Sequence, residues 1–331
     1  MRHGAMRFGF HKFDFPNSSG RIITMTTTTP FRFTLKKDDK AFTGTPIGGG
    51  LTNPRLAARN PVTGRMVVLQ ADGNIRYSDD EGLNWSAPID IGWATVSQMQ
   101  RAMMSWSKVN QCFFGAQGSF SRMGRSDDGI SWTGINYITS NYLGPFETPI
   151  PGKLLTWSIP TSGNRGYSLD LGATWQAYPT PLPIGGACKP GMNPSTGRMV
   201  TASSDPAYPG GNAAYSDDAG ETWTQFDIPG RGGLAYAVWW DEVLEMFFMA
   251  EQSGVNINRL WYAGPDGIAW NYVTFPQTTA VSYAAALDNG EIAVIGNTNW
   301  YVVESLDPFV YQSQVVNTIG YECLFSPTAE A

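Results

Sequence analysis

Short apolar runs separated by glycine-containing turns recur along the chain from residue 49 to residue 313. Residues 65–69 (RMVVL) form one such run, and residues 74–77 (NIRY) form the next. Runs of about four to eight residues with apolar alternation are typical of β-strands, whereas helices need longer segments with a period of 3.6 residues. The pattern therefore predicts an all-β protein made of many short strands.

The turns that follow these runs share a motif. Residues 77–85 read YSDDEGLNW, residues 167–175 read YSLDLGATW, and residues 215–223 read YSDDAGETW. Serine and aspartate side chains can hydrogen-bond to nearby backbone groups and so stabilise a turn, while the glycine permits a positive φ. The tryptophan then begins the next strand and can bury a large ring.

Three further copies are degenerate. Residues 125–132 (RSDDGISW) form a fourth copy, with Arg125 in the place of the serine and Asp127 as the box aspartate. Residues 263–270 (AGPDGIAW) form a fifth, with Pro265 in the place of the aspartate, and residues 305–308 (SLDP) form a sixth. The five tryptophans, at positions 85, 132, 175, 223 and 270, are spaced by 47, 43, 48 and 47 residues, enough for one four-stranded blade each.

The motif Ser-x-Asp-x-Gly-x-x-Trp resembles the Asp box, or BNR repeat, of sialidases, sortilin-type receptors and tailed-phage proteins. The resemblance implies a β-propeller of six or seven four-stranded blades, with seven favoured, and with the Asp boxes on the outer hairpin turns. It makes the box residues structural, with the five tryptophans in equivalent buried positions. These residues are Ser78, Asp80, Gly82, Trp85, Asp127, Gly129, Trp132, Ser168, Asp170, Gly172, Trp175, Ser216, Asp218, Gly220, Trp223, Gly267 and Trp270.

The chain divides into an N-terminal extension (1–48), the propeller (49–313) and a C-terminal closing strand and tail (314–331). Residues 21–25, 31–35 and 320–325 read as strands that could close the ring and so remove exposed sheet edges. A second repeat, NPVTGRMV at 60–67 and NPSTGRMV at 193–200, predicts a turn between the first and second strands of a blade.

The composition of the chain excludes several classes of function. The chain has 22 Lys+Arg against 28 Asp+Glu and a net charge of -6, without the basic cluster that nucleic acid requires. The two histidines, His3 and His11, lie in the N-terminal tail, so we expect no histidine triad, metal site or cofactor in the main body. Cys112, Cys188 and Cys323 are expected to be buried thiols. The most apolar stretch, 234–250, is interrupted by acidic residues and predicts no membrane span.

Two classes of function remain open. A sialidase-like glycoside hydrolase would use three arginines to grip a carboxylate, beside a Tyr-Glu nucleophile pair and an aspartate. Arg55, Arg101, Arg231 and Arg259 are the arginines that could face the channel, but the Arg-Ile-Pro motif of that family is missing. Trp239 and Trp240, near Tyr236, could instead bind a sugar or a partner. Strand alternation sends one tryptophan to each face, which favours core packing, and the acidic residues Asp241, Glu242 and Glu245 read as a solvated turn.

The sequence therefore favours a non-enzymatic propeller that acts as a structural or receptor-binding component of a larger particle. The resemblance points to the virion of a tailed phage, with other protein subunits or a glycan as partners. The N-terminus has no apolar segment of the Sec type. Four phenylalanines in this region, Phe8, Phe10, Phe13 and Phe15, would be an aggregation hazard if exposed, so we expect them to contact a partner subunit or the closing blade. The alternative is the sialidase-like hydrolase.

Overall fold

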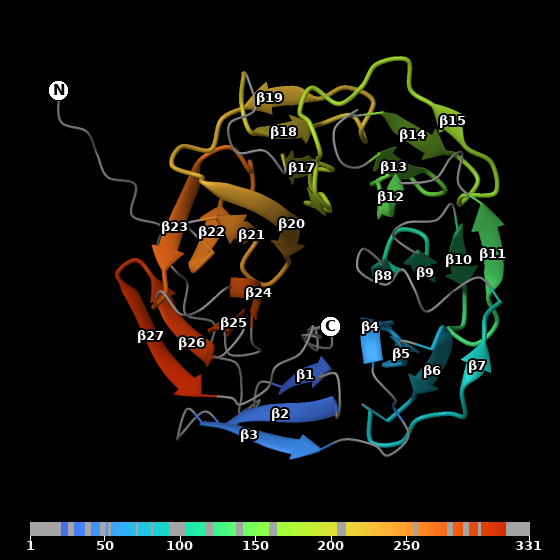
Figure 1. The fold of residues 1–331 in the computed structure, drawn as a ribbon, viewed down its shortest axis with the longest axis horizontal. Coiled ribbons are helices and arrows are strands. Elements are labelled where there is room, and N and C mark those ends of the chain that lie inside the picture. The colour runs from blue at the N-terminus through green and yellow to red at the C-terminus, as the bar shows by residue number, and fades with distance from the viewer. Residues whose placement is uncertain are drawn as a thin grey trace.

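The computed structural model describes the backbone of residues 21–25, 30–36, 41–46, 51, 54–70, 72–80, 82–92, 103–116, 122–136, 142–158, 164–203, 210–254, 257–276, 281–286, 291–296 and 299–315. These residues form seven antiparallel sheets, which follow one another around a ring with the first strand of each sheet nearest the centre (Figure 1). The all-β propeller predicted from the repeats is confirmed. Residues 320–325 and the four N-terminal phenylalanines lie outside the described residues.

The first sheet has three strands, β1 (Arg21–Met25), β2 (Pro30–Lys36) and β3 (Ala41–Pro46). Residues 21–25 and 31–35 are thus strands, as expected, whereas β3 was not predicted. The next three sheets have four strands each: β4 (Pro54–Arg59), β5 (Met66–Gln70), β6 (Asn74–Ser78) and β7 (Ile89–Asp90); β8 (Met103–Ser107), β9 (Cys112–Ala116), β10 (Arg122–Ser126) and β11 (Thr133–Asn136); β12 (Tyr142–Glu147), β13 (Leu154–Ser158), β14 (Arg165–Ser168) and β15 (Gln176–Ala177).

The remaining three sheets also have four strands each: β16 (Gly191–Met192), β17 (Met199–Ala202), β18 (Ala213–Ser216) and β19 (Thr224–Phe226); β20 (Gly233–Asp241), β21 (Met246–Gly254), β22 (Arg259–Ala263) and β23 (Trp270–Thr274); β24 (Val281–Ala286), β25 (Ile292–Gly296), β26 (Asn299–Leu306) and β27 (Phe309–Val315).

The apolar core is divided into layers that lie between neighbouring sheets. Val67 of β5 packs in one layer with Phe113 of β9, and Trp157 of β13 packs in another with Met199 of β17. Both faces of a sheet are therefore covered. As a result β5, β9 and β17 are buried along their whole length, and their sequences are apolar at consecutive positions instead of alternating.

The antiparallel order places two kinds of turn at the same end of the ring. The turn from first to second strand and the turn from third to fourth strand share this end, which we call the box end because it carries the Asp boxes. The predicted turn at residues 60–65 lies here, between β4 and β5. Asn60 closes it by accepting a hydrogen bond from Gly64 N and donating its own N–H to Arg65 O, at 2.9 and 2.8 Å.

In the part of the chain that the structure describes, no helix has the length and apolar character needed to cross a membrane. Among the same residues, no three His, Cys, Asp or Glu side chains gather as metal ligands. Cys112 and Cys188 are buried free thiols, and burial raises the pKa of Cys112 to about 12. Cys323 lies outside the described residues.

Candidate functional site

Each full Asp box is a hydrogen-bonded turn between the third and fourth strands of its sheet. In the first box the Ser78 hydroxyl donates to Asp80 Oδ1 (2.7 Å) and accepts from Gly82 N (2.8 Å). Asn84 N donates to the same Asp80 oxygen at 2.9 Å. The other two full boxes repeat these bonds with Ser168, Asp170, Gly172 and Thr174, and with Ser216, Asp218, Gly220 and Thr222.

The fourth box corrects the sequence prediction, because its serine and aspartate are Ser126 and Asp128. Ser126 Oγ donates to Asp128 Oδ1 at 2.9 Å and accepts from Gly129 N at 2.7 Å. Asp127, predicted as the box aspartate, is exposed, and its carboxylate lies 3.5 Å from the Arg125 guanidinium. The box has one residue fewer between aspartate and glycine than the full copies. Counting back from the glycine therefore placed the motif one residue too early.

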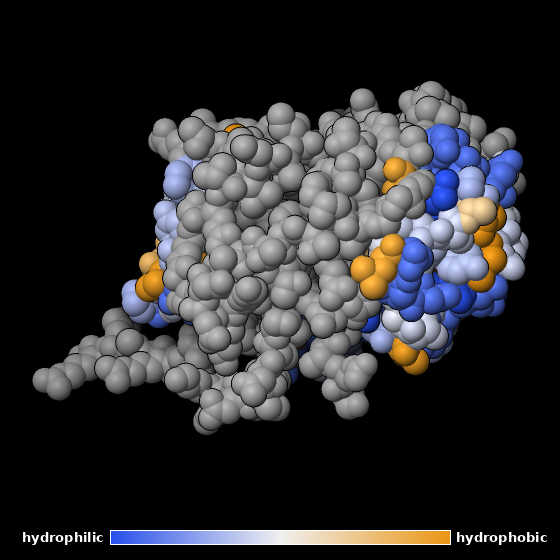
Figure 2. Space-filling model, turned by 90° about the horizontal axis from the view of Figure 1, so that it is seen from below, coloured by the Kyte–Doolittle hydropathy of each residue, from blue (hydrophilic) through white to orange (hydrophobic). Residues whose placement is uncertain are grey.

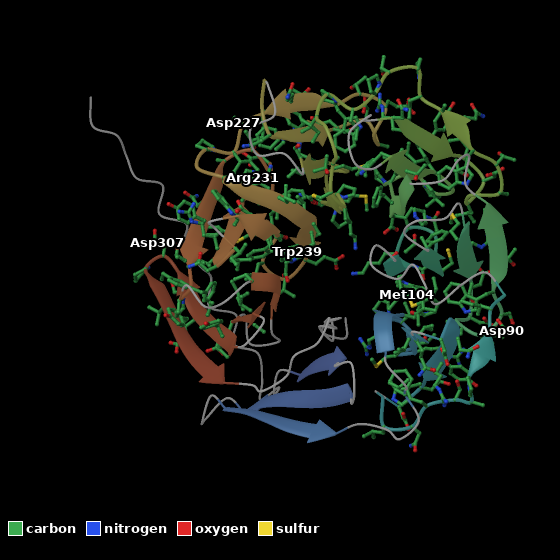
Figure 3. All side chains as sticks on the ribbon, in the orientation of Figure 1. Asp90, Met104, Asp227, Arg231, Trp239 and Asp307 are labelled. Carbon is green, nitrogen blue, oxygen red and sulfur yellow. The ribbon has the colours of Figure 1, made fainter. Side chains whose placement is uncertain are left out.

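The fifth box has the same shortened spacing, so its aspartate is Asp266 and Pro265 does not replace it. Ile268 N donates to Asp266 Oδ1 at 3.1 Å, and Gly264 stands in the place of the serine, with its carbonyl accepting from Gly267 N at 2.9 Å. The sixth box lies between β26 and β27 at the outer rim, where Asp307 is labelled in Figure 3. Asp307 N donates to Ser305 Oγ there at 3.3 Å.

The five box tryptophans occupy equivalent positions, but they are half-buried and not fully buried as expected. Each packs on the edge of a core layer: Trp85, Trp132, Trp175, Trp223 and Trp270. The indole N–H of Trp223 donates to Gly220 O, and that of Trp270 donates to Gly267 O. Each ring lies at the start of the outermost strand of its sheet or just before it, where the sheet borders solvent.

Hydrogen bonds hold the box carboxylates in their ionised form. The backbone N–H of Asn84, and then its side chain, lower the pKa of Asp80, and the hydroxyl and N–H of Thr174 do the same for Asp170. For Asp128, partial burial acts to raise the pKa, but hydrogen bonds from backbone N–H groups outweigh it and the pKa is lowered. The boxes therefore carry negative charge at the surface of the box end.

The boxes also join neighbouring sheets. Gly129 has φ +76°, and a Cβ built there would lie 2.6 Å from Val67 Cγ2 of the preceding sheet. A Cβ at Gly267 would likewise lie 2.5 Å from Val200 Cγ2 of the sheet before it. The box glycine is thus required both by its backbone conformation and by the close approach of two sheets.

Arg65, in the first copy of the NPxTGRMV repeat, links its own sheet to the next one. Its Nε and Nη2 donate to the Asp79 carboxylate at 2.6 and 2.9 Å, and its Nη1 donates to Asp128 O at 2.7 Å. The guanidinium also lies over the Tyr77 ring, 4.9 Å from its centroid. The hydrogen bond to Asp79 raises the pKa of Arg65.

Arg198, in the second copy of this repeat, makes the same contacts. It binds the Asp217 carboxylate through two bonds of 2.6 Å, donates to Asp266 O at 2.8 Å, and lies 4.4 Å from the Tyr215 ring centroid. The carbonyl acceptors in the next sheet, Asp128 and Asp266, both belong to shortened boxes. We call this arrangement the arginine latch. The sequence repeat marked its position, but its partner in the neighbouring sheet could be found only in the structure.

A different set of cations joins the β12–β15 sheet to the β16–β19 sheet. Arg165 Nη1 donates to Gly220 O at 2.6 Å and its Nη2 donates to Glu221 O at 2.9 Å. Lys153, whose side chain is 2% exposed, pairs with the Glu221 carboxylate at 2.5 Å. Sequence reasoning missed both residues, because neither belongs to a repeated motif.

Charged groups near the centre of the ring also form ion pairs and hydrogen bonds with other residues of the chain. Lys108, between β8 and β9, forms an ion pair with Glu242, between β20 and β21, and these turns belong to sheets on opposite sides of the ring (Figure 1). Glu147 accepts hydrogen bonds from Ser107 Oγ and Val109 N, both at 2.6 Å. Burial raises the pKa of Glu147, although these hydrogen bonds and nearby lysines act against it.

Two of the four arginines considered for a carboxylate clamp are described, and both bind backbone carbonyls. Arg231, labelled in Figure 3, is buried and donates through Nη1 to Asn212 O at 2.6 Å and through Nη2 to Ser203 O. Arg259 Nη1 donates to Gly230 O at 3.0 Å, with its guanidinium over the Tyr272 ring. The side chains of Arg55 and Arg101 lie outside the described residues.

The tryptophan pair on β20 packs as the strand alternation predicts. Trp239 is buried against Phe248 in the layer shared with the β24–β27 sheet, and its indole N–H donates to Ala284 O at 2.8 Å (Figure 3). Trp240 packs on the opposite face, beside Phe247. The turn after them differs from the expectation in one respect: Asp241 is buried and accepts hydrogen bonds from the N–H groups of the turn, whereas Glu242 and Glu245 are exposed. The side chain of Tyr236 lies outside the described residues.

Exposed apolar side chains occur in several of the described turns of the box end. Of the nine large apolar residues that are exposed in the described part of the chain, six lie in its turns: Val62, Leu83, Ile150, Leu169, Val243 and Ile268. The coloured part of Figure 2, a side view of the ring, shows separate hydrophobic spots among hydrophilic residues. These turns make the box end a candidate contact surface.

Comparison with known proteins supports the fold. The family model for the BNR/Asp-box repeat matches residues 214–225. No curated protein sequence matches the chain. Among solved structures, YCF48 bound to D1 peptide is 13% identical with a TM-score of 0.57, covering 90% of this chain and 85% of its own.

Two further structures are similar over most of their length. The WD40 propeller domain of Doa1 is 12% identical, with a TM-score of 0.59 and 90% of each chain covered. Virginiamycin B lyase from Staphylococcus aureus is 11% identical, with a TM-score of 0.61 and coverage of 89% and 88%. At these identities the likeness concerns the fold alone. The chain is a β-propeller that carries the BNR/Asp-box repeat.

Proposed function

We propose that this propeller is a non-enzymatic binding subunit that contacts another protein within a larger assembly. The observation that carries the proposal is the set of six exposed apolar side chains in the described box-end turns, among them Val62, which is 77% exposed. Single exposed apolar residues are ordinary on protein surfaces, but a set gathered on one end indicates a contact surface. YCF48, a structure of similar fold, is bound to a peptide, which supports protein binding as the class of function.

The charged groups of the ring favour binding over catalysis. Glu147 is hydrogen-bonded to Ser107 and Val109, Lys108 is paired with Glu242, and Arg231 is bound to backbone carbonyls. A sialidase-like hydrolase would need arginines whose donors face a substrate carboxylate, and a carboxylic acid able to exchange a proton with it. The bonds of these residues give them a structural role.

The virion of a tailed phage is the setting that we propose, with neighbouring tail subunits or a host glycan as partners. This part of the proposal rests on the resemblance of the repeats to Asp-box proteins of phage particles. The phenylalanine-rich segment, residues 1–17, is the second element that we expect to contact a neighbouring subunit.

The test is co-purification of the full chain with a particle from its own source, measured by sedimentation and mass spectrometry. We expect the chain in the particle fraction, and we expect a variant lacking residues 1–17 to be folded but absent from that fraction. Sialoside or aryl-glycoside turnover by the purified chain, abolished by Glu147→Gln, would overturn the proposal in favour of the hydrolase. Recovery of the chain solely as a free monomer would also count against it.

A further inference from the structure

The exposed apolar residues at the box end occur in pairs on alternate sheets. Val62 and Leu83 belong to the β4–β7 sheet, Ile150 and Leu169 to the β12–β15 sheet, and Val243 and Ile268 to the β20–β23 sheet. In each pair one residue lies in the turn after the first strand and the other in an Asp box. We call the box members, Leu83, Leu169 and Ile268, the outer apolar set, and the turn members the inner apolar set.

Each residue of the outer apolar set belongs to the same turn as a box carboxylate. Leu83 N donates to the backbone carbonyl of Asp80 at 3.3 Å, next to Asn84, whose N–H binds the Asp80 carboxylate, and Ile268 N donates to the Asp266 carboxylate at 3.1 Å. Leu169 directly precedes Asp170, whose pKa is lowered by hydrogen bonds to Thr174. A half-exposed apolar side chain and a negative charge are therefore presented together at three places around the ring.

Most cations of this end are paired with carboxylates. Ion pairs here engage Arg65, Lys108, Arg125, Lys153 and Arg198. Hydrogen bonds from their own turns lower the pKa values of Asp80 and Asp170. At Asp218 partial burial acts to raise the pKa, but the hydrogen bonds of the turn outweigh it and the pKa is lowered. Because those bonds bring no positive charge, the box end has an excess of negative charge.

We propose that the box end docks a protein surface in which lysine or arginine side chains lie among apolar ones; this rests on the proposed function. Lysine and arginine combine an apolar stem with a cationic head. The stem can lie on Leu83, Leu169 or Ile268 while the head reaches the neighbouring carboxylate. A second copy of this chain is a poor occupant, because two box ends would bring like charges together.

The test uses two fluorescently labelled peptides of equal length, in which leucines alternate with either lysines or glutamates, and measures their binding to the full chain by anisotropy. We expect the lysine peptide to bind at least about tenfold more tightly, and to weaken as salt rises because surface charges are screened. The outer-set variant, Leu83→Ser with Leu169→Ser and Ile268→Ser, should bind this peptide about tenfold more weakly.

The matched control carries Tyr272→Ser and Val310→Ser. These residues are 45% and 43% exposed, close to the 49% and 40% of Leu83 and Ile268, but they lie on the outer strands β23 and β27. The control should bind like the unaltered chain. If the outer-set variant loses its thermal transition, the inner-set variant (Val62→Ser, Ile150→Ser, Val243→Ser) replaces it with the same expectation.

The results separate this inference from the proposed function. Equal binding of both peptides, or unchanged binding to the folded outer-set variant, would overturn docking at the box end. If the chain nevertheless co-purified with a particle, the proposed function would stand and only the place of contact would be wrong. If the lysine peptide bound as expected and no particle association occurred, the surface would be confirmed and the assembly role overturned.

Discussion

Gly129 of the fourth Asp box approaches Val67 of the preceding sheet so closely that a Cβ built at Gly129 would lie 2.6 Å from Val67 Cγ2. The box is therefore more than a turn that reverses the chain. It also fills the gap between two sheets at the periphery, where the core layer ends. This contact and the arginine latch occur at the same seam, since Arg65 binds the carbonyl of Asp128, the residue directly before Gly129.

Gly129→Ala is expected to lower the free energy of unfolding by about 2–4 kcal/mol, because the new methyl group adds a clash to the strain of a positive φ. Gly230→Ala is the matched control. Gly230 has φ +77°, against +76° at Gly129, but nothing lies within 4 Å of a Cβ built there. The control should lose only about 1 kcal/mol, measured by urea denaturation. Equal losses in both variants would show that the contact with Val67 carries no energy.

Arg65→Ala is expected to lower the free energy of unfolding by about 1.5–3 kcal/mol, because it removes charge-assisted hydrogen bonds within and between sheets. Arg198→Ala should give a similar value, since its contacts are the same. Arg125→Ala is the control, because Arg125 makes only a 3.5 Å ion pair with an exposed aspartate and should lose less than about 0.5 kcal/mol. A loss at Arg125 as large as at Arg65 would contradict the latch.

Trp223→Ala should be less destabilising than Trp157→Ala. Trp157 is 1% exposed in the core layer, and its removal should lower the free energy of unfolding by about 3–5 kcal/mol. Trp223 is half-buried and packs edge-on against Trp157, at 5.9 Å between ring centroids. We expect about 2–3 kcal/mol for Trp223, measured in the same denaturation series. The reverse order would show that the box tryptophans are the main anchors of the core.

Asp80→Asn should reduce the dependence of stability on acid pH. The folded protein holds the pKa of Asp80 below its ordinary value. The unfolded chain therefore binds a proton at higher pH than the folded one. The stabilisation from the ionised carboxylate is complete above the unfolded pKa, about 3.9, and is lost as pH falls through the folded pKa. Thermal melts from pH 7 to pH 2 should show a shallower decline for Asp80→Asn, and an unchanged decline would contradict this role.

The sequence predicted the fold well because the Asp-box turn recurs at a similar interval in the six four-stranded sheets. It correctly predicted the positions of the full boxes and of the turn at Asn60, and it predicted that Trp239 and Trp240 lie on opposite faces of their strand. It misassigned the fourth and fifth boxes, because a one-residue deletion shifts Asp128 and Asp266 relative to the pattern while the glycine and tryptophan remain recognisable.

The candidate site was not predictable in the same way. Whether Val62 or Leu169 is exposed depends on which side of its turn faces solvent. Valine and leucine side chains could equally have been buried in the core. The inter-sheet bonds of Arg65, Arg165 and Lys153 join positions far apart in the chain. No local pattern specifies which carbonyl of the next sheet lies within reach of such a side chain.

The division of the core into layers determines which parts of the molecule unfold together. Each core layer is formed by side chains of two neighbouring sheets. Loosening the second strand of a sheet would therefore expose the layers on both of its faces and destabilise both neighbouring sheets. Amide hydrogens of β5, β9 and β17 should thus exchange together, with the free energy of global unfolding. The outermost strands β7 and β15, of two residues each, cover only one edge and can fray alone. We therefore expect the paired layers to open together around the ring, after the short strands of its rim.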